Sequence, residues 1–430
     1  MPNDATHDTT STHSSAMPQA DTQSHARPVM EKERIVSLDV LRGFAILGIL
    51  IMNIQSFSMI QAAYFNPAAY GDLTGLNRFV WVLSHMVADT KFISIFSMLF
   101  GAGIVLFSTR LEERGVAPGP VHYRRIVGLL VIGLLHGFML WSGDILTTYA
   151  LVGTVVYLFW RRTPSTLLVV GLVATAVSSA LYAMAASSIG YWPEEALQQI
   201  RYFWNPDQAV QASEIAAYTG GWGAQMSARV PAMVGALTAS FWFFLAWRTS
   251  GMMLVGMALY KWGVLSAQRS RRFYVWMGAA GLLLGYPLIA LGISRNSAAG
   301  WSLEYSFFRG SQYNYWGSLL VALGYIGVVM LIAKARPRGG VATWLAPVGR
   351  MAFTNYLMQT ALMTTVFYGH GLGLFGQVER TGQILIVFAV WAFQIWFSRF
   401  WLAHLRFGPA EWLWRSLTYG RPQPMRRAVR

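Results

Sequence analysis

The chain has 430 residues, of which 55% are hydrophobic and only 12% are charged, and its formal net charge is +15. Soluble domains carry about 25% charged residues, so this composition does not suit a water-exposed surface. The hydrophobic residues form long runs, and runs of about 18 or more are typical of membrane-spanning helices. The absence of cysteine excludes disulfides, thiolate catalysis and cysteine-based metal sites, and we predict no metal centre.

Three regions are predicted along the chain. Residues 1–33 are polar and hold no apolar run, so we expect a disordered cytoplasmic tail and no cleaved signal peptide. Residues 34–405 form a transmembrane helical domain. Residues 406–430 form a cytoplasmic interfacial segment, with a helix expected over 406–417. The predicted fold class is therefore all-α, a polytopic membrane helical bundle.

About ten transmembrane helices are expected. They lie near residues 38–60, 79–108, 125–140, 145–160, 166–189, 233–260, 273–293, 313–335, 344–367 and 384–405. A long polar segment, residues 191–230, separates the fifth span from the sixth.

Basic residues predict the orientation of these spans, because cytoplasmic loops carry an excess of Lys and Arg. With the N-terminus inside, the short cytoplasmic loops hold Arg110, Arg114, Arg124, Arg125, Arg161, Arg162, Lys261, Arg269, Arg271, Arg272, Lys334, Arg336 and Arg338. The opposite side holds Arg78, Arg201, Arg229, Arg295, Arg309 and Arg380, spread over longer segments. The pattern favours two cytoplasmic termini in a bacterial inner membrane, with the lipid bilayer and not nucleic acid as the partner.

Polar residues within the first span need a reason, because a charge at the bilayer centre costs about 2.5–3.5 kcal/mol on insertion scales. Asp39 and Arg42 are three residues apart and can pair near the cytoplasmic end. Asn53 follows Arg42 by eleven residues and lies on the same helix face. Arg42 is interpreted as a ligand for an anionic substrate group and Asn53 as facing a buried cavity. The alternatives are a snorkelling arginine and a helix–helix hydrogen bond.

The second and third spans supply the candidate catalytic residues His85, Asp89 and His136, and Lys91 and Asp144 are candidate substrate-binding residues near them. His85 and Asp89 are four residues apart, and a carboxylate beside an imidazole is the pairing that a general base needs. Lys91 points about 200° away from Asp89, so both need partners on other helices. His136 lies close to Asp144 across a tight turn. The alternatives are a water-exposed His85, a structural Asp89–Lys91 pair, and Asp144 at a helix N-terminus.

The remaining motifs provide further binding candidates and helix-packing sites but no additional catalytic group. Arg350 and Asn355 are candidate substrate-binding residues in the ninth span. The glycine-rich stretches at 100–103 and 133–137 are interpreted as close-packing seams between helices. The chain has no phosphate-binding loop, no HExxH motif and no GxSxG motif.

Several segments resemble the YeiB-like bacterial membrane proteins. They are SLDVLRGFAILG at residues 37–48, FSMLFGAG at 96–103, WSGDIL at 141–146 and FGPAEWLWRSLTYG at 407–420. The resemblance covers nearly everything after residue 34.

That family is distantly similar to the transmembrane acyltransferases, which include enzymes that modify surface sugars and the lysosomal heparan glucosaminide N-acetyltransferase. Some members carry an arginine, ten residues and then a histidine in the first span, whereas Asn53 stands at that position here. The lysosomal enzyme is similar in having asparagine at that position, and its catalytic histidine comes from the loop that follows. In this chain the corresponding loop, residues 61–77, contains no histidine. His85 and His136 are the nearest replacements.

The resemblance implies an acyltransferase that passes an acyl group from cytoplasmic acyl-CoA to a small-molecule or glycan acceptor on the outer side. Acyl-CoA is the expected donor substrate, and no tightly bound cofactor is expected. Asp39, Asn53, Asp89 and His136 would form a series of polar groups that runs from the cytoplasmic side of the membrane to the outer side. The alternatives are a transporter or flippase of an amphipathic small molecule and a non-catalytic membrane protein. The sequence does not specify the oligomeric state.

Overall fold

The protein is described by a computed structural model that covers residues 34–336 and 339–426. The predicted tail at residues 1–33 lies outside this range. Helices make up the fold, and the described residues form no β-strand beyond an isolated bridge between Leu405 and Arg426. The predicted all-α class is confirmed.

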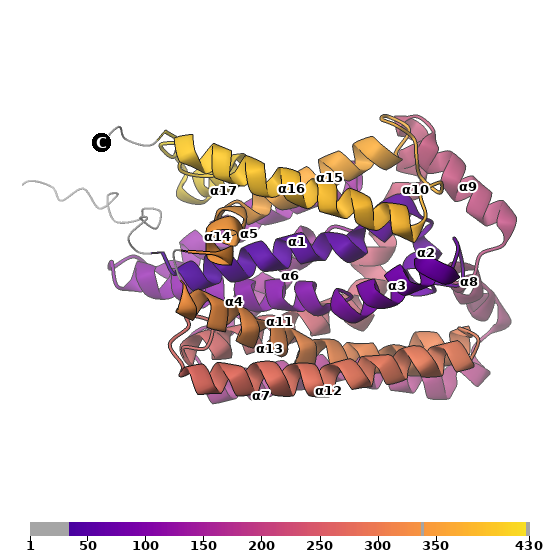
Figure 1. The fold of residues 1–430 in the computed structure, drawn as a ribbon, viewed down its shortest axis with the longest axis horizontal. Helices are drawn as coiled ribbons and strands as arrows, with labels where there is room; N and C mark the ends of the chain where they lie inside the picture. The colour runs from indigo at the N-terminus through magenta and orange to yellow at the C-terminus, as the bar shows by residue number, and fades with distance from the viewer. Residues whose placement is uncertain (1–33, 337–338, 427–430) are drawn as a thin grey trace, which may run out of the picture.

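Seventeen α-helices follow one another along the described part of the chain (Figure 1). They are α1 (Val36–Ser58), α2 (Gln61–Phe65), α3 (Gly75–Val87), α4 (Lys91–Glu112), α5 (Pro118–Leu135), α6 (Leu146–Val156), α7 (Pro164–Ser188), α8 (Glu194–Trp204), α9 (Gln208–Thr219), α10 (Trp222–Gly235), α11 (Ala246–Lys261), α12 (Arg271–Ala298), α13 (Ser311–Ala335), α14 (Val341–Arg350), α15 (Ala352–Phe367), α16 (Arg380–His404) and α17 (Pro409–Tyr419). Three π-helical segments interrupt them: η2 (His136–Leu140), η5 (Ala236–Leu245) and η6 (Leu303–Gly310).

Eight helical stretches in the described chain are long and apolar enough to cross a membrane. This confirms a polytopic membrane bundle. The predicted fourth span corresponds to the shorter apolar helix Leu146–Phe159. The predicted ninth span is divided at Met351 into α14 and α15.

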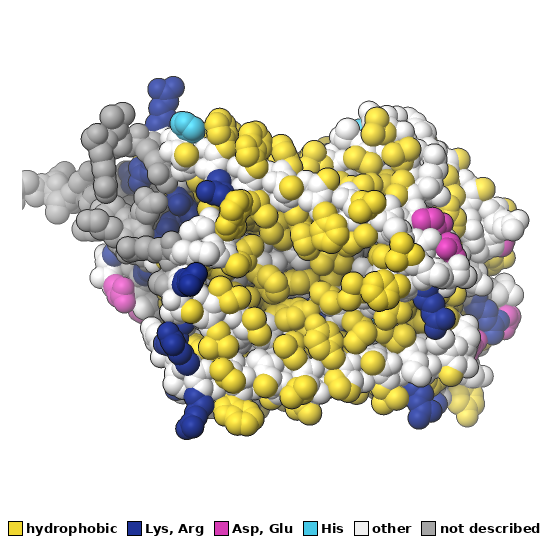
Figure 2. All heavy atoms as spheres, viewed as in Figure 1, with side chains coloured by type: hydrophobic (Ala, Val, Ile, Leu, Met, Phe, Trp, Pro, Cys, Tyr) yellow, Lys and Arg dark blue, Asp and Glu magenta, His cyan; other side chains and the backbone are white. Residues whose placement is uncertain are grey.

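The long helices run along the longest axis of the molecule (Figure 1). The start of α1, together with α14 and α17, lies at one end, hereafter the α17 end. Helices α2, α8 and α9 lie at the other, the α9 end. On the face shown in Figure 2, hydrophobic side chains cover the middle of the molecule, and Lys and Arg side chains gather toward its two ends. An apolar belt between charged ends is the surface that a bilayer requires.

The predicted second span is not a single helix. Thr90 has a left-handed backbone with φ of 60°, and it separates α3 from α4. The last carbonyl groups of a helix lack partners within it. Here the Lys91 ammonium donates to the His85 carbonyl oxygen at 2.6 Å. A buried lysine therefore donates to one of the carbonyl groups left without a partner at the end of α3.

The division of the ninth span into α14 and α15 also leaves backbone groups that need hydrogen-bond partners from elsewhere. The first N–H groups of a helix need acceptors, and a carboxylate there is favoured. The Glu411 carboxylate on α17 accepts from the backbone N–H groups of Phe353 at 2.7 Å and Thr354 at 3.2 Å, and from the Thr354 hydroxyl. Helix α17 thus provides the N-terminal cap of α15.

The predicted close packing at residues 100–103 is confirmed for one of its glycines. A Cβ atom at Gly101 on α4 would overlap the Met253 carbonyl group on α11. The reciprocal contact involves Gly256, where a Cβ atom would overlap the Met98 carbonyl. Gly103 has open space at the corresponding position. Helices α4 and α11 therefore meet backbone to backbone through Gly101 and Gly256.

The polar segment at 191–230 contains α8, α9 and the start of α10. It is joined to the loop after α1, where the Asn66 side chain donates to the Trp204 carbonyl at 3.2 Å and the Gln61 N–H donates to Glu214 at 2.9 Å. Burial raises the pKa of the Glu214 carboxyl above its usual value. These helices cover the α9 end of the bundle.

Candidate functional site

A buried series of hydrogen bonds joins Asp144, His136 and Thr360. His136 begins the π-helical segment η2, Asp144 follows in the turn before α6, and Thr360 lies on α15. The distance from His136 Nδ1 to Asp144 Oδ1 is 2.8 Å, and the distance from His136 Nε2 to Thr360 Oγ1 is 2.9 Å. The side chains of His136 and Asp144 are 2% and 0% exposed. The predicted neighbours therefore meet, with a third partner from a distant helix.

The partners assign the imidazole tautomer. An ionised carboxylate only accepts hydrogen bonds, so Nδ1 of His136 carries the proton and Nε2 accepts from the Thr360 hydroxyl. The second oxygen of Asp144 accepts from the Thr147 N–H at 2.7 Å, at the start of α6. Asp144 thus holds both the ring and a helix N-terminus. A histidine oriented by a carboxylate, with its basic nitrogen on a hydroxyl, has the arrangement of a general base.

Aromatic residues surround this hydrogen-bonded series. The Tyr356 ring lies 5.2 Å from the His136 ring, between centroids, and its hydroxyl accepts from the Ile145 N–H at 3.3 Å. Trp141 stacks on Phe57 of α1 at 4.1 Å. Asn53 stands one turn before Phe57 on α1, is half-buried, and forms no side-chain hydrogen bond within the described chain.

The other predicted catalytic pair forms a separate cluster at the α3–α4 break. His85 Nδ1 lies 3.1 Å from Asp89 Oδ2. Asn314 on α13 joins this pair to Lys91: its amide donates to Asp89 at 2.7 Å and its oxygen accepts from Lys91 at 2.8 Å. No hydrogen bond between described residues connects this cluster with His136. The expected series of polar groups across the membrane is thus divided into two centres.

Arginines gather at the α17 end. Arg42 and Arg34 pair with Asp39, with nitrogen–oxygen distances of 3.0 and 3.4 Å. Arg125 and Arg415 lie close enough to both Arg42 and one another to interact electrostatically. Burial, and next the positive charge of Arg34, lower the pKa of Arg415. This arginine cluster (Arg34, Arg42, Arg125 and Arg415) has the charge for a phosphate-bearing group.

The two remaining predicted binding residues lie on α14 and α15. Arg350 ends α14, is half-buried, and comes directly after Gly349, which packs against the backbone of Asp39 and Gly43 on α1. Asn355 is fully buried, and its amide donates to the Val348 carbonyl at 3.1 Å and the Ser398 hydroxyl at 3.0 Å. Asn355 therefore connects α15 with α14 and α16.

The sequence interpretation missed Thr360 and Tyr356. A periodic signal was present, because Tyr356, Thr360 and Thr364 follow at intervals of four and form a polar stripe on α15. The polar stripe on α15 does not show which residues of other helices its side chains contact.

The fold and its buried polar centres define a polytopic helical membrane protein. The chain belongs to the YeiB-like family. A family profile described as "Protein of unknown function (DUF418)" matches residues 259–421. The uncharacterized protein YeiB of Escherichia coli (strain K12) is 33% identical over 410 residues, which cover 90% of this chain and 96% of that protein.

Two Bacillus proteins are also similar over nearly their full lengths. Uncharacterized protein YxaH of Bacillus subtilis (strain 168) is 34% identical to this chain, and the matched region covers 94% of this chain and 98% of that protein. An uncharacterized 39.9 kDa protein encoded in the amylase 3′ region of Bacillus acidopullulyticus is 28% identical over 93% of this chain and 97% of its own. These names state no reaction, so membership of the family does not specify one.

Proposed function

We propose that this protein is a transmembrane acyltransferase of the bacterial inner membrane that takes acyl-CoA from the cytoplasm and modifies an acceptor on the outer side. The observation that carries the proposal is the buried series Asp144–His136–Thr360, because an imidazole is oriented there with its basic nitrogen on a hydroxyl. The proposed topology has ten spans and two cytoplasmic termini, with the α17 end inside.

The chemistry follows from the His136 tautomer. In the proposed reaction, Nε2 of His136 removes the proton from the acceptor hydroxyl or amine, whose oxygen or nitrogen attacks the thioester carbonyl carbon. The carbon–sulfur bond breaks, and the departing CoA thiolate takes the proton from the His136 imidazolium. Asp144 stabilises that imidazolium. The Asn53 amide donates to the carbonyl oxygen as its charge develops.

The position of His136 is compatible with an acceptor that enters from the outer side. Arg125, at the α17 end, precedes His136 by eleven residues along α5. At 1.5 Å per residue they span roughly 16 Å, about half the thickness of a bilayer core. Thr360 occupies Nε2 of His136, and Trp141 is buried beside the ring. The proposed reaction therefore requires the Thr360 hydroxyl to move away from Nε2 before the acceptor can bind there.

The arginine cluster is the proposed donor site. Coenzyme A carries several phosphates, and guanidinium groups bind phosphate through paired hydrogen bonds. Arg42 has a side chain that is 29% exposed, and it stands on the same helix as Asn53. The CoA arm would extend along α1 from Arg42 toward Asn53.

Acetyl-CoA is expected to raise the melting temperature of the detergent-purified protein, and Arg42→Ala to remove that rise. A ligand at 100 times its dissociation constant adds about 2.7 kcal/mol of native-state stability. Arg161→Ala is the matched control, since it removes an exposed arginine from the same predicted side. Equal responses from both variants, or no wild-type response to acetyl-CoA and longer acyl-CoAs, contradict the donor site.

The centre at Asp89 and Lys91 favours a second candidate, a transporter or flippase of an amphipathic small molecule. Buried ionisable groups within spans mark ion and substrate pathways. Flux of substrate into vesicles without covalent change would support transport over acyl transfer.

A further inference from the structure

Arg399 lies on α16, close to the end of a membrane-spanning helix. Helix α16 has 25 residues and is one of the stretches long and apolar enough to cross a membrane. At 1.5 Å per residue it is roughly 37 Å long, so its ends extend beyond a hydrocarbon core of about 30 Å. Arg399 precedes His404, the last residue of α16, by five residues. It therefore lies where acyl chains meet headgroups, at the α17 end of the molecule (Figure 1).

The described residues supply no counter-ion for Arg399. Its exposed side chain forms no ion pair and no hydrogen bond within residues 34–336 and 339–426. The guanidinium carbon lies 4.4 Å from the centre of the Trp344 ring on α14, a cation–π contact. Stacking of this kind uses the face of the guanidinium and leaves the N–H groups at its edge for an anion. Because arginine stays protonated and a charge that faces lipid is costly, an anion from the bilayer would stabilise it.

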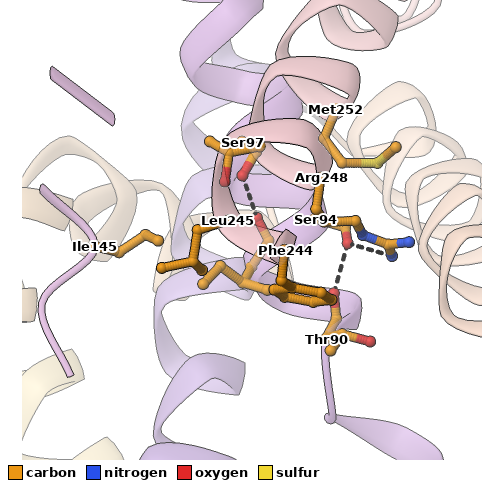
Figure 3. A pocket seen from close by; sticks show the side chains of 10 residues that line it. Thr90, Ser94, Ser97, Ile145, Phe244, Leu245, Arg248 and Met252 are labelled. Carbon is orange, nitrogen blue, oxygen red and sulfur yellow. Dashed lines mark hydrogen bonds between the residues drawn. The ribbon is translucent and has the colours of Figure 1, made fainter. Parts of the chain in front are cut away.

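A buried arginine of the same bundle, Arg248 on α11, has protein partners instead. Its guanidinium donates to the Tyr315 carbonyl at 2.6 Å and to the Ser318 hydroxyl at 2.9 Å. Figure 3 shows its third acceptor, the Ser94 hydroxyl, at 3.0 Å. The cavity drawn there has a volume of about 20 Å³, room for about one water molecule. Arg399 differs from Arg248 both in its lack of acceptors and in the space beside it.

A groove of about 430 Å³ adjoins Arg399 on the surface of the bundle. It lies between α14 and α16, which pack against each other, and Figure 1 shows α14 beside the part of α16 that leads into α17. The groove is lined by Trp344, Ala392, Ile395, Trp396, Arg399 and Phe400. Three of these, Trp344, Trp396 and Phe400, are 50%, 59% and 55% exposed. An open apolar wall therefore lies beside a single cation, at the depth where tryptophan is common in membrane proteins.

We propose that this groove binds one anionic phospholipid, with its headgroup phosphate on Arg399 and an acyl chain along the aromatic wall. A phosphate accepts paired hydrogen bonds from a guanidinium, and its charge balances that of Arg399. Basic pockets between membrane-spanning helices on the cytoplasmic side bind acidic headgroups in this way, and the α17 end is the proposed cytoplasmic side. The inference is independent of acyl transfer, because neither His136 nor any member of the arginine cluster lines the groove.

Native mass spectrometry of the full-length protein tests the site, with phosphatidylglycerol and phosphatidylcholine of identical acyl chains added to the detergent. We expect one phosphatidylglycerol molecule to stay bound at concentrations at which phosphatidylcholine does not. Arg399→Gln is expected to weaken phosphatidylglycerol binding about tenfold or more, because hydrogen bonds between charged groups are the strong ones. Trp396→Ala keeps the arginine and removes part of the apolar wall, so we expect a loss of about fivefold.

The matched control is Arg272→Gln. Arg272 is another exposed arginine on the same predicted side, near the start of α12, and it does not line the groove. This variant is expected to keep its phosphatidylglycerol. Equal binding of the two lipids, equal losses in Arg399→Gln and Arg272→Gln, or unchanged binding in Trp396→Ala would overturn the proposal. Displacement of the lipid by glycerol phosphate would also overturn it, because the site would then bind a free phosphate and not a lipid.

Discussion

His136→Gln is expected to reduce acyl transfer by about 10²–10⁴-fold, the usual contribution of a positioned general base. Glutamine fits the volume and can hydrogen bond to Asp144, but it cannot accept and return a proton. The measurement is release of the CoA thiol from acetyl-CoA by membrane vesicles supplied with a panel of amines, alcohols and sugars. The rise in melting temperature with acetyl-CoA should persist, because His136 lies far from the arginine cluster.

The matched control is His122→Phe. His122, on α5, is a second buried histidine. Its ring stacks on Tyr157 at 4.1 Å, and its Nε2 lies 3.2 Å from the Gly153 carbonyl oxygen. This variant should retain thiol release. Retained activity in His136→Gln, or an equal loss in both variants, would count against His136 as the base. Loss in His85→Gln alone would transfer the role to the Asp89 centre.

Gly101→Ala is expected to lower stability, whereas Gly103→Ala is expected to leave it unchanged or raise it. The methyl group at Gly101 overlaps the backbone of Met253, so α4 and α11 must separate. Overpacking costs about 1–3 kcal/mol, and occasionally more. Gly103 meets nothing within 4 Å, and alanine is the better helix former by roughly 1 kcal/mol. Thermal unfolding in detergent should therefore show a lower melting temperature for Gly101→Ala and an equal or higher one for Gly103→Ala.

Gly103→Ala is the matched control for Gly101→Ala, because both positions lie on α4 and receive the same methyl group. Similar melting temperatures for the two variants would mean that the α4–α11 contact is looser than the structure shows. Gly256→Ala, the reciprocal position on α11, should behave like Gly101→Ala.

Hydropathy predicted where the helices lie, because a bilayer requires long apolar runs whatever the tertiary contacts are. The sequence also predicted that His136 and Asp144 approach each other, since only a short turn separates them. It did not predict Thr360, which is 224 residues away from His136 in the chain and meets it through packing of α15.

The break between α3 and α4 was also missed. The residues around it, Val87 to Lys91, include no glycine or proline that would indicate a turn. The left-handed Thr90 lies between two residues that Asn314 on α13 binds, Asp89 and Lys91, and Lys91 also donates to the His85 carbonyl. Asn314 is more than 220 residues away in the chain, so the local sequence does not reveal this contact.

The cap that α17 provides to α15 has a consequence for biosynthesis. Glu411 leaves the ribosome after every predicted span, so α15 enters the membrane before its first N–H groups have their acceptor. We therefore expect docking of α17 to follow membrane insertion of α15. A chain truncated after His404 should insert in the membrane yet remain sensitive to protease near Met351, and Glu411→Gln should show an intermediate sensitivity. Equal protection of the truncated and complete chains would contradict this order of assembly.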